Sequence, residues 1–82
     1  MTTASNEVQA SKILDAKGLN CPLPILRARK ALQDLASGEV LQILATDPGS
    51  LNDMASFCRQ TGNELLSSGE AGGTYQFLIR KA

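Results

Sequence analysis

The residues best suited to carry chemistry lie in one short segment, Gly18-Leu19-Asn20-Cys21-Pro22-Leu23-Pro24. Helical spacing of apolar residues begins at Pro22, so Cys21 is predicted to be the N-cap of a helix and Pro22 its first residue. Pro24 still falls among the positions whose N–H groups have no partner within the helix. The positive end of a helix dipole stabilises a thiolate, which commonly lowers the cysteine pKa. Because both prolines lack an N–H donor, we expect the pKa of Cys21 to be lowered only moderately.

A thiolate at this position has a defined reactivity. It can attack a sulfane sulfur as it would attack a disulfide, and the product is a persulfide, a reversible modification of cysteine. A single cysteine in a small protein is, however, most often a buried and unreactive apolar residue. The residues alone therefore leave two interpretations open, a reactive Cys21 and a structural one.

The elements that must position this segment follow from the spacing of apolar and turn residues. Ile25, Ala28, Leu32 and Leu35 form one stripe of a helix that begins at Pro22 and ends at Ser37-Gly38. Ser50 is the predicted N-cap of a second helix, with Asp53 at its third position, Leu51, Met54, Ala55 and Cys58 on its apolar face, and Gly62 at its end. Strands are predicted at 12–16, 39–46, 64–67 and 74–81, the last two joined by a glycine-rich turn at 69–73.

The resulting order is βαβαββ, which predicts an α/β two-layer sandwich. Strand–helix–strand crossovers favour parallel pairing with right-handed connections, and the terminal hairpin adds an antiparallel pair. We therefore expect a mixed four-stranded sheet with two helices on one face, and Tyr75, Phe77 and Ile79 turned toward the helices. Residues 1–10 are predicted to be a flexible N-terminal tail and residues 11–82 a single domain.

The composition excludes several classes of site and partner. Eight basic and eight acidic side chains give a net charge of zero, which argues against direct binding to nucleic acid or to an anionic membrane. The chain has no histidine and no Cys-x-x-Cys pair, so we expect neither a metal nor another cofactor. With no signal peptide and no long apolar run, a cytoplasmic location is expected. Thiols stay reduced there, so Cys21 and Cys58 are predicted to be free. We also expect the protein to be a monomer.

The run LDAKGLNCPLP at 14–24 resembles the signature of the TusA/SirA-like family, small proteins in which a Cys-Pro-x-Pro motif opens the first helix. The likeness extends to ATDPGS at 45–50, FCRQTGNEL at 57–65 and YQFLIRK at 75–81, and covers about residues 13–81. The resemblance implies a βαβαββ fold and a persulfide on Cys21. It also implies a sulfur donor, a cysteine desulfurase or a rhodanese-like protein, and an acceptor protein in tRNA thiolation, molybdenum cofactor assembly or dissimilatory sulfur metabolism. It does not choose among these pathways.

The leading hypothesis is therefore a sulfurtransferase that acts as a carrier, with Cys21 as the sulfur-bearing residue and Gly18, Pro22 and Pro24 shaping the start of its helix. The alternative is a regulatory module, or one that binds protein or RNA, in which Cys21 is structural or redox-sensitive. The reactivity of Cys21 distinguishes the two.

Other polar residues have two interpretations each. Arg27 and Lys30 share a helix face with Asp34, either as a patch for docking the sulfur donor or as a solvated surface with a Lys30–Asp34 pair. Asp15 lies at the end of the first predicted strand, and Asp47 directly follows the second. Each either shapes the Cys21 loop or belongs to an ordinary turn.

The second cysteine, Cys58, is expected to pack in the core, and the sharper alternative makes it a redox partner of Cys21.

Overall fold

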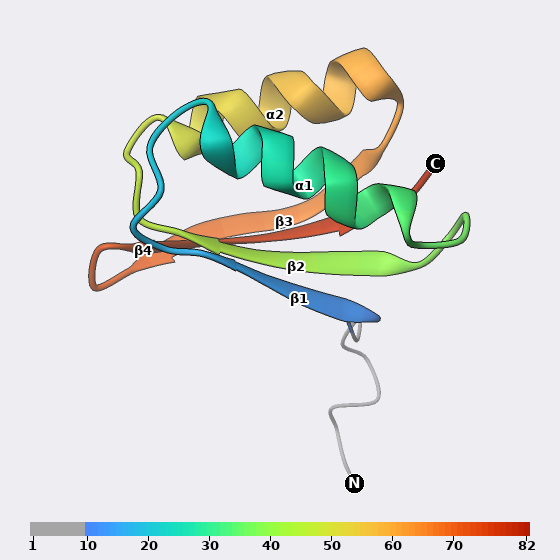
Figure 1. The fold of residues 1–82 in the computed structure, drawn as a ribbon, viewed down its shortest axis with the longest axis horizontal. Coiled ribbons are helices and arrows are strands. Elements are labelled where there is room, and N and C mark those ends of the chain that lie inside the picture. Colours follow the sequence, from blue (N-terminus) through green and yellow to red (C-terminus); the bar gives the residue numbers. More distant parts are fainter. Residues whose placement is uncertain (1–9) are drawn as a thin grey trace, which may run out of the picture.

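The order of elements agrees with the βαβαββ prediction. A computed structural model describes residues 10–82. Its elements are β1 (Lys12–Ala16), α1 (Leu23–Gln33), β2 (Val40–Ala45), α2 (Ser50–Thr61), β3 (Glu64–Ala71) and β4 (Thr74–Arg80). Figure 1 shows both helices on the same side of the sheet, which confirms the two-layer architecture. Apart from Ala10, the predicted tail at 1–10 lies outside the described residues, and its division from a domain at 11–82 stays a prediction.

The sheet has the strand order β1-β2-β4-β3 and is mixed. β1 pairs with β2 in parallel, and β4 pairs antiparallel with both β2 and β3. Ile43 in β2 is aligned with Leu14 in β1 and with Phe77 in β4. Since aligned residues of neighbouring strands point to the same face, these three side chains form one row beneath the helices.

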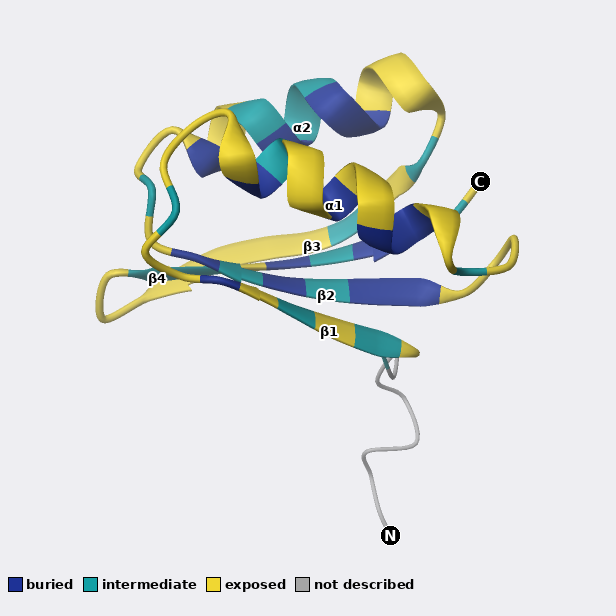
Figure 2. Ribbon diagram, viewed as in Figure 1, coloured by how far each residue is buried: buried dark blue, intermediate teal, exposed yellow. Residues whose placement is uncertain are grey.

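The core lies between this face of the sheet and the inner faces of the two helices (Figure 2). Phe77 and Ile79 are fully buried, as predicted, and Tyr75 is half-buried at the margin of the cluster. The buried residues of the core cluster are Ala16, Ala28, Ala31, Leu32, Leu41, Ile43, Ala45, Met54, Phe57, Cys58, Phe77 and Ile79. None of the helices in the described range 10–82 is long and apolar enough to cross a membrane.

The first helix is shorter than predicted at its C-terminal end. It ends at Gln33, with Asp34 as the C-cap, rather than at Ser37-Gly38. The chain beyond the cap turns back toward β2, and Glu39 accepts a hydrogen bond from the N–H of Ala36 at 2.8 Å. This local bond replaces the helical bond that Ala36 would otherwise make, so the final apolar residue of the stripe, Leu35, lies outside the helix.

The second helix begins one residue away from its predicted position. Gly49 is the N-cap, and Ser50 is the first helical residue, buried, with its hydroxyl donating to the carbonyl of Asp47 at 2.7 Å. The predicted stop at Gly62 is confirmed, since this glycine takes the left-handed conformation. The predicted apolar face was wrong at Leu51, which is exposed, and missed Phe57, which is buried.

The terminal hairpin is longer and tighter than predicted. β3 continues to Ala71, and the turn consists only of Gly72 and Gly73, whose φ angles are 60° and 87°. Two successive residues with positive φ match the right-handed twist of a hairpin, and glycine adopts them without a steric penalty. Gly69, placed in the turn by its residue type, instead pairs with Gln76 inside the ladder.

Replacing Phe77 by alanine is expected to lower the free energy of unfolding by about 3–5 kcal/mol, because it leaves a cavity in a fully buried site. Gln76→Ala is the matched control: the neighbouring position is exposed, and the expected change is within about 0.5 kcal/mol. Urea denaturation of both variants measures the difference. Equal effects at the two positions would contradict the assignment of the buried face of β4.

Candidate functional site

Cys21 is exposed and lies in the loop between β1 and α1. The N-cap of α1 is Pro22, with no side-chain capping bond, so Cys21 precedes the cap and the prediction of Cys21 as the N-cap was wrong by one residue. The peptide bond between Cys21 and Pro22 is cis. Pro24, the second helical residue, is fully buried and anchors the first turn of α1 in the core.

Two hydrogen bonds join the Cys21 loop to the loop between β2 and α2. The N–H of Gly18 donates to Thr46 Oγ1 at 2.9 Å, and the N–H of Cys21 donates to Asp47 Oδ2 at 3.2 Å. Both loops leave the carboxyl ends of adjacent parallel strands, and Figure 1 shows them beside each other at one edge of the sheet. The structure therefore gives Asp47 a direct contact with the backbone of Cys21.

Gly18 has a φ of 83°, a conformation that side-chain-bearing residues rarely adopt. A Cβ atom placed on it meets no atom within 4 Å, so its conformation and not crowding accounts for the glycine. This turn directs the Gly18 N–H at Thr46, a residue that no motif in the sequence marked as part of the site.

The thiol of Cys21 faces two carboxylates. Its Sγ atom and one oxygen each of Asp47 and Asp53 lie within 4.8 Å of one another. The hydrogen bond between the thiol and Asp53 raises the pKa of Cys21, and reduced hydration and the negative charges of Asp53 and Asp47 raise it further. The prediction of a moderately lowered pKa was therefore wrong.

The physical reason lies in the balance of charges around the sulfur. The helix dipole supplies about half a positive charge, and the prolines at positions 22 and 24 remove two of the N–H groups that would present it. The negative charges of Asp47, in the loop before α2, and of Asp53, in α2, oppose this positive charge. Asp53 was read only as a capping residue of α2. The signal that could have placed it is the adjacency of the two parallel strands, which brings the first turn of α2 next to the Cys21 loop.

One sulfur and two carboxylate oxygens at this spacing could in principle surround a cation. Zinc sites in proteins are built mainly from cysteine and histidine, and this chain has no histidine. Each carboxylate already has a partner at Cys21, the N–H for Asp47 and the thiol for Asp53. We interpret both as partners of Cys21 and not as metal ligands.

Asp15 contacts Lys17, two residues further along the chain. Its Oδ1 accepts the N–H of Lys17 at 3.0 Å and lies 3.4 Å from Lys17 Nζ. The backbone hydrogen bond from Lys17 is the main cause that lowers the pKa of Asp15. Asp15 thus fixes the turn that leads into the Cys21 loop.

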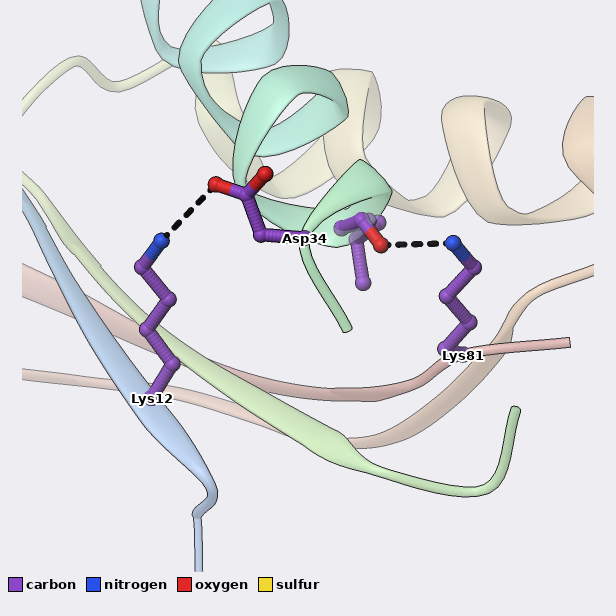
Figure 3. A network of polar contacts seen from close by, with 4 residues as sticks. Lys12, Asp34 and Lys81 are labelled. Carbon is purple, nitrogen blue, oxygen red and sulfur yellow. Dashed lines mark hydrogen bonds and ion pairs between the residues drawn. The ribbon is translucent and has the colours of Figure 1, made fainter. Parts of the chain in front are cut away.

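Arg27 and Lys30 line a groove between α1 and β1, together with Lys12, Leu14, Ala31 and Asp34. Asp34 pairs with Lys12 of β1 at 3.2 Å, and not with Lys30 as its helical spacing indicated. Figure 3 shows this pair, and beside it Lys81 donating to the carbonyl of Leu32 at 2.7 Å, so β1 and the residue after β4 are both tied to the end of α1. With Asp34 engaged by Lys12, the groove keeps an excess of basic side chains.

Cys58 is buried in the core cluster, and its burial raises its pKa. Both cysteines are free, as predicted. Leu23, Leu26 and Leu51, on the first turns of α1 and α2, are 43%, 52% and 39% exposed. The exposed thiol therefore lies near apolar surface, while the second thiol is closed off.

The sequence pattern of the family described as Sulfurtransferase TusA matches residues 12–81 of this chain. The chain belongs to the TusA family. It is 61% identical over 69 residues to the sulfur carrier protein TusA of Allochromatium vinosum, covering 84% of this chain and 91% of that protein. It is 48% identical over 68 residues to the sulfur carrier protein TusA of Pseudomonas entomophila, covering 83% and 85%.

The fold also matches a solved structure. The crystal structure of a SirA-like protein from Desulfitobacterium hafniense superimposes with a TM-score of 0.75 at 27% sequence identity, covering 84% of this chain and 95% of that one. The sequence resemblance and the predicted two-layer fold are thus both confirmed.

The raised pKa predicts how Cys21 responds to pH. Iodoacetamide reacts with the thiolate, so its rate of reaction with Cys21 should reach half its maximum at a higher pH than with free cysteine. Mass spectrometry should find one alkylated cysteine in the folded protein and two after denaturation, because Cys58 is buried. A midpoint at or below that of free cysteine would contradict the effect of the two carboxylates.

Proposed function

We propose that this TusA-family protein is a sulfur carrier that holds sulfane sulfur as a persulfide on Cys21. The observation that carries the proposal is an exposed, free thiol at the start of α1 in a chain 61% identical to a protein named as a sulfur carrier. The second cysteine is buried, so Cys21 is the thiol accessible to a partner. It needs no metal or organic cofactor for this exchange.

The transfer is an exchange between two thiols. The Cys21 sulfur attacks the terminal sulfur of a donor persulfide, a new S–S bond forms, and the S–S bond of the donor breaks with its electron pair going to the donor thiol. An acceptor thiol then attacks the terminal sulfur on Cys21, and Cys21 leaves with the electron pair. Oxidised and reduced sulfur are only redistributed, so no external oxidant or reductant is required.

The partners we propose are proteins. The donor is a cysteine desulfurase or a rhodanese-like protein, and the acceptor is a further sulfur-carrying protein of tRNA thiolation, molybdenum cofactor assembly or sulfur oxidation. We place this exchange in the cytoplasm, where thiols stay reduced, and propose that the carrier is a monomer. The exposed leucines of both helix starts offer an apolar surface for transient docking, and the Arg27–Lys30 groove between α1 and β1 offers a basic one.

Incubation with a cysteine desulfurase and L-cysteine should add the mass of one sulfur atom to the intact protein, and a reductant should remove it. Cys21→Ser should abolish the gain, whereas Cys58→Ser should retain it, because the Cys58 side chain only packs in the core. A folded wild-type protein that gains no sulfur from a desulfurase or from a rhodanese-type donor would favour the alternative of a regulatory module.

Reversing the charge of Arg27 tests the basic groove. Arg27→Glu should slow sulfur loading from the desulfurase several-fold at low ionic strength, with a smaller effect at high salt, because steering by charge is screened. Arg59→Glu is the control, since Arg59 is exposed in the last turn of α2, away from this groove. Loading rates and a salt dependence unchanged by Arg27→Glu would remove the groove from the docking surface.

A further inference from the structure

The two carboxylates beside Cys21 have different contacts. Asp47 accepts the backbone N–H of Cys21 at 3.2 Å and so fixes the loop. One oxygen of Asp53 lies within 4.8 Å of the Cys21 Sγ atom, and hydrogen bonding to this carboxylate is the main cause that raises the pKa of Cys21. It is half-buried in the first turn of α2, where its own N–H donates to the carbonyl of Gly49 at 3.0 Å and its neighbour Met54 is fully buried. The Asp53 carboxylate is therefore held in the first turn of α2, with one oxygen within 4.8 Å of the reacting sulfur.

We propose that Asp53 is a catalytic residue of this site, the group that accepts the proton of the Cys21 thiol when sulfur is loaded and returns it when sulfur is released. This inference rests on the proposed carrier function. The chain has no histidine and its second free cysteine, Cys58, is buried, so Asp53 supplies the proton acceptor.

The proton balance closes in both directions. During loading, the S–H proton of Cys21 passes to the Asp53 carboxylate as the Cys21 sulfur bonds to the terminal sulfur of the donor. The donor sulfur departs with the electron pair of the broken S–S bond, and protonated Asp53 passes its proton to that sulfur or to water. During release, the acceptor thiol loses its proton to Asp53 or to water as it attacks the terminal sulfur on Cys21. Cys21 departs as the thiolate, and that proton then restores its thiol.

Among residues 10–82, two carboxylates lie beside the Cys21 thiol, and their contacts with Cys21 differ. The charges that act on the Cys21 thiol are Asp53 from α2 and Asp47 from the loop before it. The Asp47 oxygen in contact with Cys21 is engaged by the backbone N–H. On the remaining side of the loop, Lys17 pairs with Asp15. Because the two carboxylates keep Cys21 as the thiol near neutral pH, transfer needs an acceptor for its proton.

The test compares Asp53→Asn with the wild type in two reactions. Alkylation by iodoacetamide needs only free thiolate, so removing the carboxylate should move its midpoint to lower pH and speed alkylation at pH 7. Glu64→Gln is the matched control, because Glu64 is exposed and pairs with Arg80 at the opposite end of the sheet. Cys58 should stay unmodified in each variant, which shows that the fold is retained.

The second reaction is sulfur loading from glutathione persulfide, a small donor that needs no protein docking, followed by mass spectrometry between pH 6 and pH 8. Without Asp53 the loading rate should be proportional to the fraction of Cys21 present as thiolate, which rises about tenfold per pH unit below the pKa. The wild-type rate should rise less steeply with pH. The ratio of wild-type to variant rates should therefore exceed one at pH 6, on the order of tenfold or more, and fall as pH rises. Asp53→Glu should restore part of the loading.

The proposal would be overturned if the ratio of wild-type to variant loading rates did not change with pH, or if it were 1 or less at pH 6. An alkylation midpoint unmoved by Asp53→Asn would also overturn it, as would a loss of loading seen only with a desulfurase as donor, which would make Asp53 a docking contact. If the wild type itself takes up no sulfur from either donor, the carrier function fails, and the role of Asp53 falls with it. In that case, the shift of the alkylation midpoint in Asp53→Asn still shows whether Asp53 acts on the Cys21 thiol.

Discussion

The parallel pairing of β1 with β2 brings the carboxyl ends of both strands to one edge of the sheet, and the candidate site is built from the two loops that leave this edge. A parallel pair requires a crossover, here α1, so the loop that carries Cys21 must also begin a helix. The same edge starts α2 and presents Asp53. Two hydrogen bonds, Gly18 to Thr46 and Cys21 to Asp47, then fix one loop against the other. Sheet topology thus determines which charges the thiol meets.

Those charges oppose the helix dipole. A helix start offers about half a unit of positive charge, and it is felt within roughly one turn. Cys21 precedes the cap residue, and Pro22 and Pro24 remove donors from the turn that follows. The carboxylates of Asp53 and Asp47 act more strongly on the thiol than this weakened helix dipole, so the pKa of Cys21 is raised. The Cys-Pro-x-Pro motif therefore positions the thiol rigidly, while the neighbouring helix sets its protonation.

Local residue patterns were sufficient to predict the order of elements, the two layers and the inward-facing residues of β4, because alternation and helical spacing report burial directly. They misplaced the end of α1 and the extent of the hairpin turn, where a side chain of Glu39 and a two-glycine turn override the pattern. Cys21, Gly18 and Asp47 were identified from the motif and the strand ends. Asp53 was seen only as part of a helix cap, because its contact with Cys21 joins residues 32 positions apart and depends on which strands are neighbours.

A raised pKa has two consequences that suit a carrier between its partners. Each unit of increase lowers the thiolate population at neutral pH about tenfold, while intrinsic nucleophilicity rises only about threefold, so the free thiol reacts more slowly with small oxidants and alkylating agents. A thiol of higher pKa is also a slower leaving group, so a persulfide on Cys21 is discharged less readily by stray thiols. Exchange that proceeds through the free thiolate is then slow, and a docked partner speeds transfer by supplying proximity and orientation. For the proposed function, this makes the carboxylates beside Cys21 a means of keeping sulfur on the carrier between partners.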